Sequence, residues 1–174
     1  MAAIFAFTCQ CCGERHEGSP SFGCDAPLAY QQLSEGERAK RALLTEDICA
    51  IRHDDHTDFF ARVVLEIPIH GVTEPFAWGV WVSLSEANIR RYTESWGEHD
   101  EADAYPGWFC NRLPYYPDTI NLRTKVHPRN GGIRPWLELE PTDHPLSVHA
   151  REGLTVAQAQ EIAEAVLHGA RSKG

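Results

Sequence analysis

The sequence lacks any apolar run that approaches the ~18 residues needed to cross a membrane as a helix. Its beginning, Met1 to Thr8, has no basic segment followed by a long apolar stretch, which is the pattern of a secretory signal. Basic residues are few, with 16 Lys and Arg against 25 Asp and Glu and a formal net charge of −9. Nucleic-acid-binding proteins normally display a basic stripe. We therefore expect a cytoplasmic protein that contacts neither a membrane nor nucleic acid.

Several common catalytic motifs are also missing. The chain has no P-loop, no G-x-G-x-x-G, no G-x-S-x-G and no H-E-x-x-H. Each absence argues against one familiar class of enzyme. None of them excludes an enzyme of an unfamiliar class.

Cysteine, in contrast, is present and clustered. The six cysteines are Cys9, Cys11, Cys12, Cys24, Cys49 and Cys110. In a chain without a secretion signal, clustered cysteines are more often metal ligands or free thiols than disulfides. Cys9-x-x-Cys12 follows a short apolar run, and Gly13 allows the positive φ that a tight turn needs. This pattern predicts a zinc-binding knuckle.

Two thiolates are only half of a tetrahedral zinc site. The candidates to complete it are His16, Cys24 and Cys49, with Cys11 as an alternate member of the knuckle. His16 is close in sequence, and Cys49 lies on a predicted strand that could run beside residues 2–8. Four protein ligands leave no position for water, so we expect the zinc to be structural.

Two other interpretations of the cysteines remain open. They could be buried or idle thiols without a metal. A redox role for the Cys9-x-x-Cys12 pair is the weaker alternative, because a thioredoxin-type motif opens a helix, whereas Gly13 and Gly18 favour a turn.

Hydrophobic periodicity predicts two hairpins and several capped helices. The expected strands are Phe59 to Ile69 with Phe76 to Leu84, and Ile120 to Val126 with Trp136 to Glu140. Helices are expected from Ala26 to about Leu33, from Ser34 to about Ala42, after Ser85, and from Thr155 to about Leu167. The segment from Pro141 to Pro145 is expected to be irregular.

These elements predict an α+β fold, a mainly antiparallel β-sheet with helices packed on one face and an N-terminal zinc-knuckle-like segment. We expect one domain over residues 1–174. Within it, 1–24 form the metal-knuckle segment, 25–45 a helical arm, and 46–174 the sheet-and-helix core.

The second predicted hairpin carries many charges. Arg123, Lys125 and His127 alternate along one strand, and Glu138 alternates with Glu140 on its partner. Cross-strand charge pairing explains this pattern. The alternative is a ligand-binding or catalytic face, with His127 or His144 as acid or base and the carboxylates of Glu138 and Asp143 as partners.

One further polar segment, His53-Asp54-Asp55-His56, falls between two predicted strands. We interpret it as a solvated loop. Adventitious metal binding there is the alternative.

An ordered set of motifs resembles a bacterial family, the domain-of-unknown-function family 2199. The motifs are CxxCGxxH from Cys9 to His16, Asp25-Ala26-Pro27, Leu65 to Pro68, Trp78 to Ser85, Tyr116 to Thr119, and Glu138 to Leu146. The resemblance covers nearly the whole chain, from Cys9 to the last helix. It implies a bacterial, cytoplasmic setting and no particular reaction.

The resemblance also bears on single residues. It implies Cys9, Cys12, His16 and Cys49 as family-type positions and so as the zinc ligands. The remaining cysteines have no counterpart in the family pattern: Cys11, Cys24 and Cys110. The resemblance also supports Asp143 and His144 as functional residues, but it implies no particular role for them.

The favoured function is a zinc-stabilised, non-enzymatic binding or interaction domain. The partner considered for this domain is a protein. A second hypothesis is an unrecognised hydrolase or small-molecule enzyme that uses the polar residues His127, Glu138, Asp143 and His144. A third is an immunity or regulatory protein whose acidic surface covers a basic partner.

Overall fold

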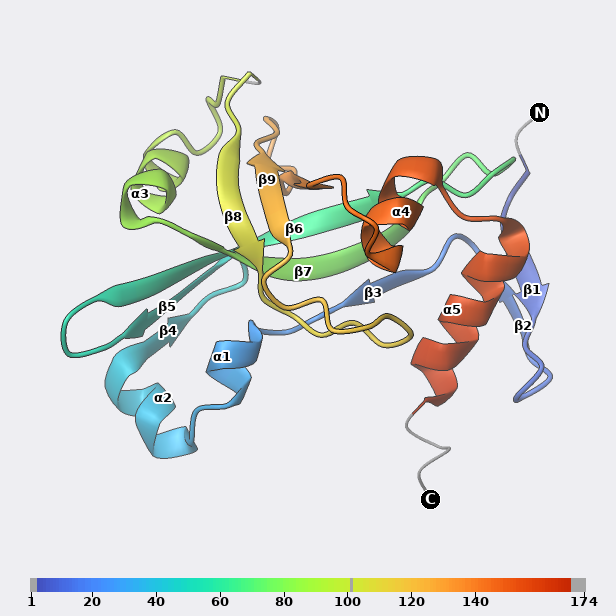
Figure 1. The fold of residues 1–174 in the computed structure, drawn as a ribbon, viewed down its shortest axis with the longest axis horizontal. Coiled ribbons are helices and arrows are strands. Elements are labelled where there is room, and N and C mark those ends of the chain that lie inside the picture. Colours follow the sequence, from blue (N-terminus) through green and yellow to red (C-terminus); the bar gives the residue numbers. More distant parts are fainter. Residues whose placement is uncertain (1–2, 101, 170–174) are drawn as a thin grey trace.

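A closed ring of five strands forms the centre of the computed structural model, which describes residues 3–100 and 102–169. The five strands of the ring are β6 (Thr57–Ile67), β7 (Phe76–Leu84), β8 (Tyr105–Phe109), β9 (Arg123–His127) and β10 (Trp136–Leu139). They pair in that order, and β10 pairs back with β6 through Trp136 and Val64. The sheet thereby becomes a small barrel (Figure 1).

Short strands extend the ring. β5 (Ile48–Arg52) pairs with β6, β4 (Ala42–Leu44) pairs with β5, and β3 (Ser21–Gly23) runs parallel to β7. A separate two-stranded sheet consists of β1 (Ala6–Thr8) and β2 (Arg15–Glu17). Most pairings in the described residues are antiparallel, as expected, while β3–β7 and β6–β10 are parallel. The fold is therefore a mixed one, a barrel with added strands and helices.

Five helices occupy three places around the described part of the barrel. They are α1 (Leu28–Gln31), α2 (Glu35–Arg41), α3 (Glu86–Glu94), α4 (Pro145–Glu152) and α5 (Val156–His168). In Figure 1, α1 and α2 lie below β4 and β5, α3 lies beside β8, and α4 and α5 lie at the other end. The predicted packing of all helices on one face is not confirmed. A sheet that closes on itself has no single open face for them to cover.

Local sequence signals position the helix starts. Ser34 with Glu37, and Thr155 with Gln158, form the predicted capping boxes, and the Ser85 hydroxyl accepts the Asn88 N–H. Helix α4 was not predicted, because Pro145 suggested irregular structure. Proline fits a first helical turn, where its missing N–H would have no partner anyway.

The core has two parts. The main part contains one face of β7, formed by alternate residues from Phe76 to Leu84, and the buried stripe of α5 (Ala159, Ile162 and Ala163). The smaller part lies on the other face of β7 and contains Cys49, Ile51, Phe60 and Trp81. Because β5 pairs with β4 and β6, and β1 pairs with β2, the prediction that the Cys49 strand runs beside residues 2–8 is wrong.

None of the helices within residues 3–100 and 102–169 has the length and apolar character that crossing a bilayer requires.

Candidate metal centre

The knuckle is the connection between β1 and β2. The Cys9 N–H donates to the Glu14 carbonyl at 2.8 Å, and the Gly13 N–H donates to the Cys9 carbonyl at 2.9 Å. Gly13 has a φ of 74°, which confirms the prediction of a positive value there. The turn is therefore tight, and it holds Cys9 and Cys12 close together.

The surroundings of the Cys9 sulfur favour its thiolate form. The residue is buried, with 1% of its surface exposed, and burial by itself raises the pKa of a thiol. Hydrogen bonds from the backbone N–H groups of Cys12 and Cys11, and one with the Cys12 thiol, outweigh that effect and lower the pKa of Cys9. The thiolate is the form that binds metal ions.

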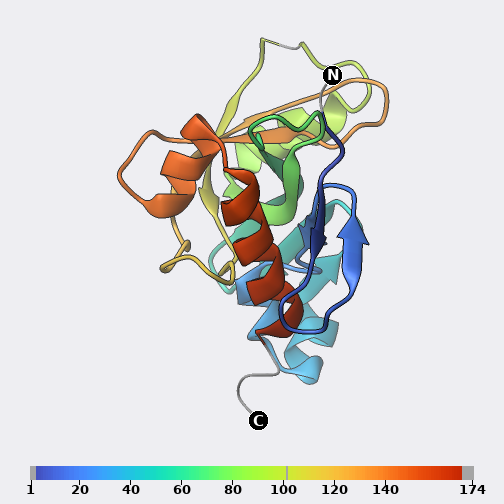
Figure 2. The same cartoon turned by 90° about the vertical axis from the view of Figure 1, so that its right-hand side faces the viewer.

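A histidine from the far end of the chain completes the first group. His168, in the last turn of α5, places its Nε2 3.0 Å from the Cys9 Sγ. The ligand atoms of Cys9, Cys12 and His168 all lie within 4.8 Å of one another. Figure 2 shows α5, in red, running alongside the dark-blue β1–β2 hairpin.

Two other contacts hold α5 against the hairpin. The Gln10 N–H donates to the Glu164 carboxylate at 2.9 Å, and the Gln160 side chain donates to the Thr8 carbonyl at 3.4 Å. Gln160, Glu164 and His168 are spaced by four residues, so they share one side of the helix. This polar stripe was the signal in the sequence that could have identified His168.

His16 belongs to a second group that shares a ligand with the first. The ligand atoms of Cys12, Glu14 and His16 also lie within 4.8 Å of one another. The His16 ring stacks on Phe7 at 5.1 Å, and its Nε2 is buried with no hydrogen-bond partner among the described residues. A buried imidazole nitrogen without a partner, beside a thiol and a carboxylate, is available as a metal ligand.

The donor set fits zinc. Two cysteines and two histidines are borderline-soft ligands that zinc takes in a tetrahedron. The structure brings Cys9, Cys12 and His168 into one group and places His16 in another that shares Cys12, so His16 must move closer to Cys9 and His168 to complete the tetrahedron. The 3.0 Å between Cys9 Sγ and His168 Nε2 is about half an ångström shorter than the S···N edge of roughly 3.5 Å in such a site. A small outward shift of the imidazole would therefore admit the ion.

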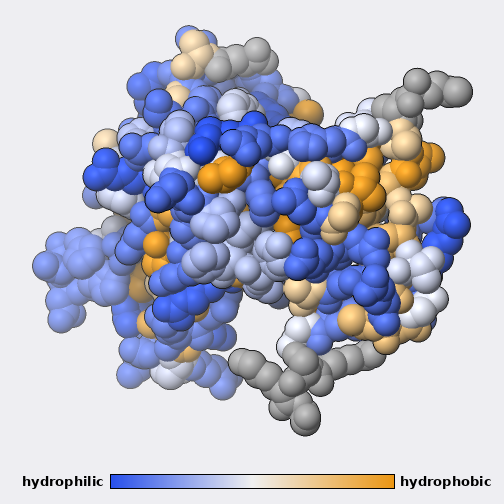
Figure 3. Space-filling view, turned by 45° about the vertical axis from the view of Figure 1, so that its right-hand side comes forward, coloured by the Kyte–Doolittle hydropathy of each residue, from blue (hydrophilic) through white to orange (hydrophobic). Residues whose placement is uncertain are grey.

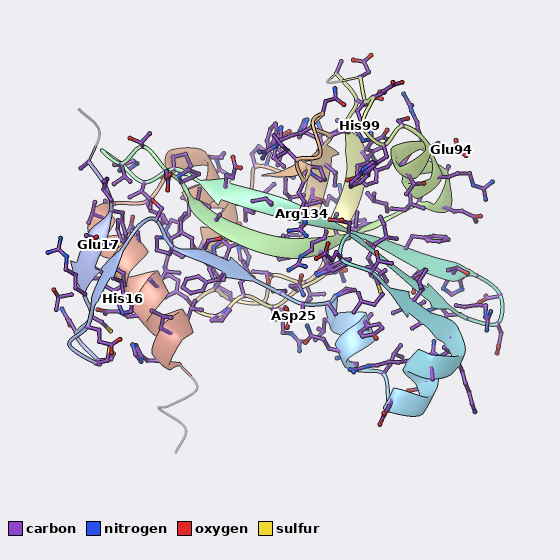
Figure 4. All side chains as sticks on the ribbon, turned by 180° about the vertical axis from the view of Figure 1, so that it is seen from behind. His16, Glu17, Asp25, Glu94, His99 and Arg134 are labelled. Carbon is purple, nitrogen blue, oxygen red and sulfur yellow. The ribbon has the colours of Figure 1, made fainter. Side chains whose placement is uncertain are left out.

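Cys49 lies apart from both groups. Its strand, β5, is at the opposite end of the molecule from the hairpin that carries His16 (Figure 4). Burial, with a smaller effect of Cys110, raises the pKa of Cys49 to about 12. Burial likewise raises the pKa of Cys24. The structure thus places the two more distant candidates for the fourth ligand away from Cys9 and Cys12.

Apart from Lys125, the charged side chains of the second hairpin pair across the strands in the described residues. Glu138 faces Lys125, its carboxylate lies 2.6 Å from His127 Nε2, and the His127 ring stacks on Trp136 at 4.0 Å. Glu140 lies 3.9 Å from Arg123. Cross-strand pairing, the simpler interpretation of this pattern, accounts for these contacts.

Asp143 and His144 lie elsewhere, at the start of α4. His144 is the N-cap residue: its Nδ1 accepts the Leu146 N–H, and its Nε2 donates to the Asp118 carbonyl at 3.1 Å. Asp143 is exposed on the preceding loop. The structure joins His127 with Glu138 and gives His144 a capping role, so the four polar candidates do not form one constellation.

A surface cavity of about 870 Å³ is lined by residues of the strands β6 to β10 and of the start of α3. It is lined by six charged side chains, Asp58, Glu86, Arg123, Lys125, Glu138 and Glu140, and by the half-exposed Trp108. A second cavity of about 590 Å³ is mainly apolar and shares Glu138 with the first. On the face seen in Figure 3, hydrophobic side chains gather towards the side that carries β1 and α5, while most of the rest is hydrophilic.

Comparison with known proteins gives one match. Residues 8–154 match the model of a family described as "Uncharacterized protein conserved in bacteria (DUF2199)". Neither the curated proteins nor the solved structures include a match. Cys9, Cys12 and His16 fall inside the matched range, and His168 falls beyond it.

Proposed function

The chain belongs to the DUF2199 family of proteins conserved in bacteria, and we propose that it is a zinc-stabilised binding domain. Cys9, Cys12 and His168 are three of the proposed ligands. The observation that carries the proposal is the surroundings of Cys9, whose buried sulfur receives two backbone N–H groups and lies 3.0 Å from an imidazole nitrogen. A lone structural thiol needs neither feature.

The fourth ligand in this proposal is His16. Its unpartnered Nε2 and its membership of the group that shares Cys12 support this assignment. With four protein ligands the ion has no open position, so its role is to hold the β1–β2 hairpin against α5. Apart from the Cys9–His168 contact, the hydrogen bonds between the hairpin and α5 are few in the described residues. A metal ion would strengthen the attachment of the hairpin to α5.

The binding surface in this proposal is the 870 Å³ cavity. Trp108 presents nearly half of its surface there, beneath the Arg123 guanidinium at 5.5 Å from the ring centre. Lys125 has no ion pair among the described residues. An exposed aromatic ring beside charged groups is typical of a site that binds a polar partner or ligand.

Metal analysis of protein purified without chelators tests the zinc proposal. We expect about one equivalent of zinc by mass spectrometry. The double variant Cys9→Ser/Cys12→Ser should lose it, and His168→Ala should retain less than the wild type. Cys110→Ser is the matched control, because Cys110 belongs to neither group, and it should keep the full equivalent.

Two results would contradict the proposal. One is wild-type protein that contains no metal and takes up no Zn²⁺ when it is added under reducing conditions. The other is a Cys9→Ser/Cys12→Ser variant with unchanged zinc content and unchanged thermal stability.

A further inference from the structure

The turn between β5 and β6 contains a third group of possible ligands. His53, His56 and Asp58 offer ligand atoms that all lie within 4.8 Å of one another. We infer that this turn is a second metal site, one that takes a divalent transition-metal ion such as Zn²⁺ and leaves part of the ion's coordination open. The site is independent of the knuckle, since β5 and β6 do not contact β1 or β2 through strand pairing.

Both imidazoles are directed at the same carboxylate. His53 Nε2 lies 2.8 Å from Asp58 Oδ2, and His56 Nε2 lies 3.5 Å from Asp58 Oδ1. The two rings are stacked, with centroids 4.6 Å apart and planes inclined by 18°. In a tetrahedral zinc site with ligand bonds of about 2.1 Å, neighbouring ligand atoms are roughly 3.4 Å apart. The observed spacings lie on either side of that value, so the ion needs only small side-chain movements.

The hydrogen bond on the other nitrogen of His56 favours metal binding. His56 Nδ1 lies 2.6 Å from Asp55 Oδ1, which fixes the ring proton on Nδ1 when the imidazole is neutral. The lone pair on Nε2 then faces the Asp58 carboxylate, an unfavourable arrangement unless Nε2 is protonated or a metal ion lies between them. A carboxylate behind a ligating histidine is also the usual outer support of a metal site.

His53 must change its tautomer before its Nε2 can bind the ion. Its Nδ1 lies 3.4 Å from Arg41 Nη1, which can only donate, so in the neutral ring the proton is on Nε2, facing Asp58. Metal binding at Nε2 would move that proton to Nδ1 and displace Arg41. The arginine keeps other partners, the Glu37 carboxylate at 3.1 Å and the Arg52 carbonyl at 3.3 Å, so the movement costs little.

The backbone holds the ligands in place. The His53 N–H donates to the His56 carbonyl at 2.8 Å, and Arg52 pairs with Thr57 as the strands begin. The three ligands thus come from one short, hydrogen-bonded turn and the first residues of β6. Little backbone conformational entropy therefore remains to be lost when the ion binds.

The proposed site borders the 870 Å³ cavity, because Asp58 also lines it, together with Thr57 and Phe59. Four carboxylates and two basic side chains line that cavity, a balance that attracts cations. Three protein ligands leave at least one position on the ion for water or a ligand, as in catalytic zinc sites. The hydroxyl of Thr124, which is buried and has no partner among the described residues, lies in the same wall.

A zinc titration followed by NMR of the histidine side chains tests the inference. We expect the wild type to bind a second equivalent of Zn²⁺ in addition to the one at the knuckle. The Nε2 resonances of His53 and His56 should shift together as the second equivalent binds. The Cys9→Ser/Cys12→Ser variant should lose the first equivalent and keep the second, so the two proposals can fail separately.

Variants within the turn identify the ligands. His56→Ala and Asp58→Asn should abolish the second equivalent without changing the first, and Asp55→Asn should weaken it by about 10- to 100-fold. Asp54→Asn is the matched control, an exposed carboxylate of the same turn outside the group, and it should bind as the wild type does. Circular dichroism of each variant should match the wild type, since the turn is at the surface.

Three outcomes would overturn the inference. The titration could end at one equivalent. The second equivalent could survive both His56→Ala and Asp58→Asn, which would mean weak binding elsewhere. Finally, the Nε2 of His56 could stay protonated throughout, which would mean a His56–Asp58 ion pair only.

Discussion

At the scale of single residues, Asn111 shows how a polar side chain can serve the fold alone. It is buried, its Oδ1 accepts the Trp81 N–H at 2.8 Å, and its Nδ2 donates to the Ala26 carbonyl at 2.9 Å. The residue therefore joins the barrel strand β7 to the segment that leads into α1. Both bonds are buried, so no water can replace the side chain if it is removed.

We predict that Asn111→Ala lowers the free energy of unfolding by about 2–3 kcal/mol, because it leaves a buried donor and a buried acceptor without partners. Urea denaturation measures this change. Asn88→Ala, at a partly exposed position of α3, is the matched control and should change stability by less than about 0.5 kcal/mol. Equal effects of the two variants would contradict the prediction.

His149 gives the molecule a dependence on pH. Burial lowers the pKa of His149, although the Glu152 charge acts in the opposite direction, and the Tyr116 hydroxyl lies 2.9 Å from its Nδ1. The folded state therefore binds a proton less readily than the unfolded state, whose histidine has a pKa near 6.5. The stability that His149 contributes is complete above about pH 6.5 and decreases as the pH falls below it.

We predict that His149→Gln reduces the loss of stability between pH 7 and pH 5. The measurement is the free energy of unfolding in urea at several pH values, for the variant and the wild type. His70→Gln, which removes an exposed histidine, is the comparison. A variant that loses as much stability on acidification as the wild type would refute the role of His149.

At the scale of the elements, the close approach of β7 and β8 depends on a glycine. A Cβ at Gly107 would lie 2.6 Å from the Ser83 carbonyl oxygen and 3.1 Å from Leu84. The neighbouring atom is backbone and cannot move aside without separating the strands. Closure of the barrel therefore requires a residue without a side chain at this position.

We predict that Gly107→Ala destabilises the protein by about 1–3 kcal/mol, as overpacking of an interior does. Gly36→Ala, in α2, is the opposite case: a Cβ there meets nothing within 4 Å, and alanine should stabilise the helix by about 0.5–1 kcal/mol. Thermal unfolding of both variants should show a lower Tm for Gly107→Ala and a higher Tm for Gly36→Ala. A Gly107→Ala protein as stable as the wild type would show that β7 and β8 can separate without cost.

The elements also show how far the sequence determines the fold. Capping boxes at Ser34 and Thr155 and the two hairpins were predictable, because they depend on residues close in the chain. The closure of the barrel was not, because it depends on a parallel contact between Trp136 and Val64, which no local pattern signals. The sequence analysis also did not predict the short strand β3, which pairs in parallel with β7, or helix α4, which begins at a proline.

The same distinction applies to the candidate metal centre. Cys9, Cys12 and His16 belong to one motif, and the structure brings their ligand atoms into two groups that share Cys12. His168 is 156 residues beyond Cys12, so the motif itself does not indicate it, and the polar stripe of α5 is its signal in the sequence. Cys49 was favoured on the assumption of a strand pairing that the chain does not make.

At the scale of the whole molecule, the proposed zinc should stabilise the chain as a ligand does. With free Zn²⁺ at 100 times its Kd, the gain is about 2.7 kcal/mol. For a protein of this size that corresponds to a rise of roughly 5–10 °C in Tm. Differential scanning fluorimetry with a chelator and with Zn²⁺ measures the difference. An unchanged Tm in the wild type, or an equal change in Cys9→Ser/Cys12→Ser, would contradict the prediction.

The position of His168 has a consequence for biosynthesis. A ribosome makes Cys9, Cys12 and His16 before α5, and His168 follows Cys12 by 156 residues, so its imidazole exists only after α5 has been translated. A nascent or truncated chain that lacks α5 can offer zinc only three of the four proposed ligands. Tight zinc retention would then distinguish chains that contain α5 from chains that lack it. A chain that lacks α5 would lose its zinc to competing thiols.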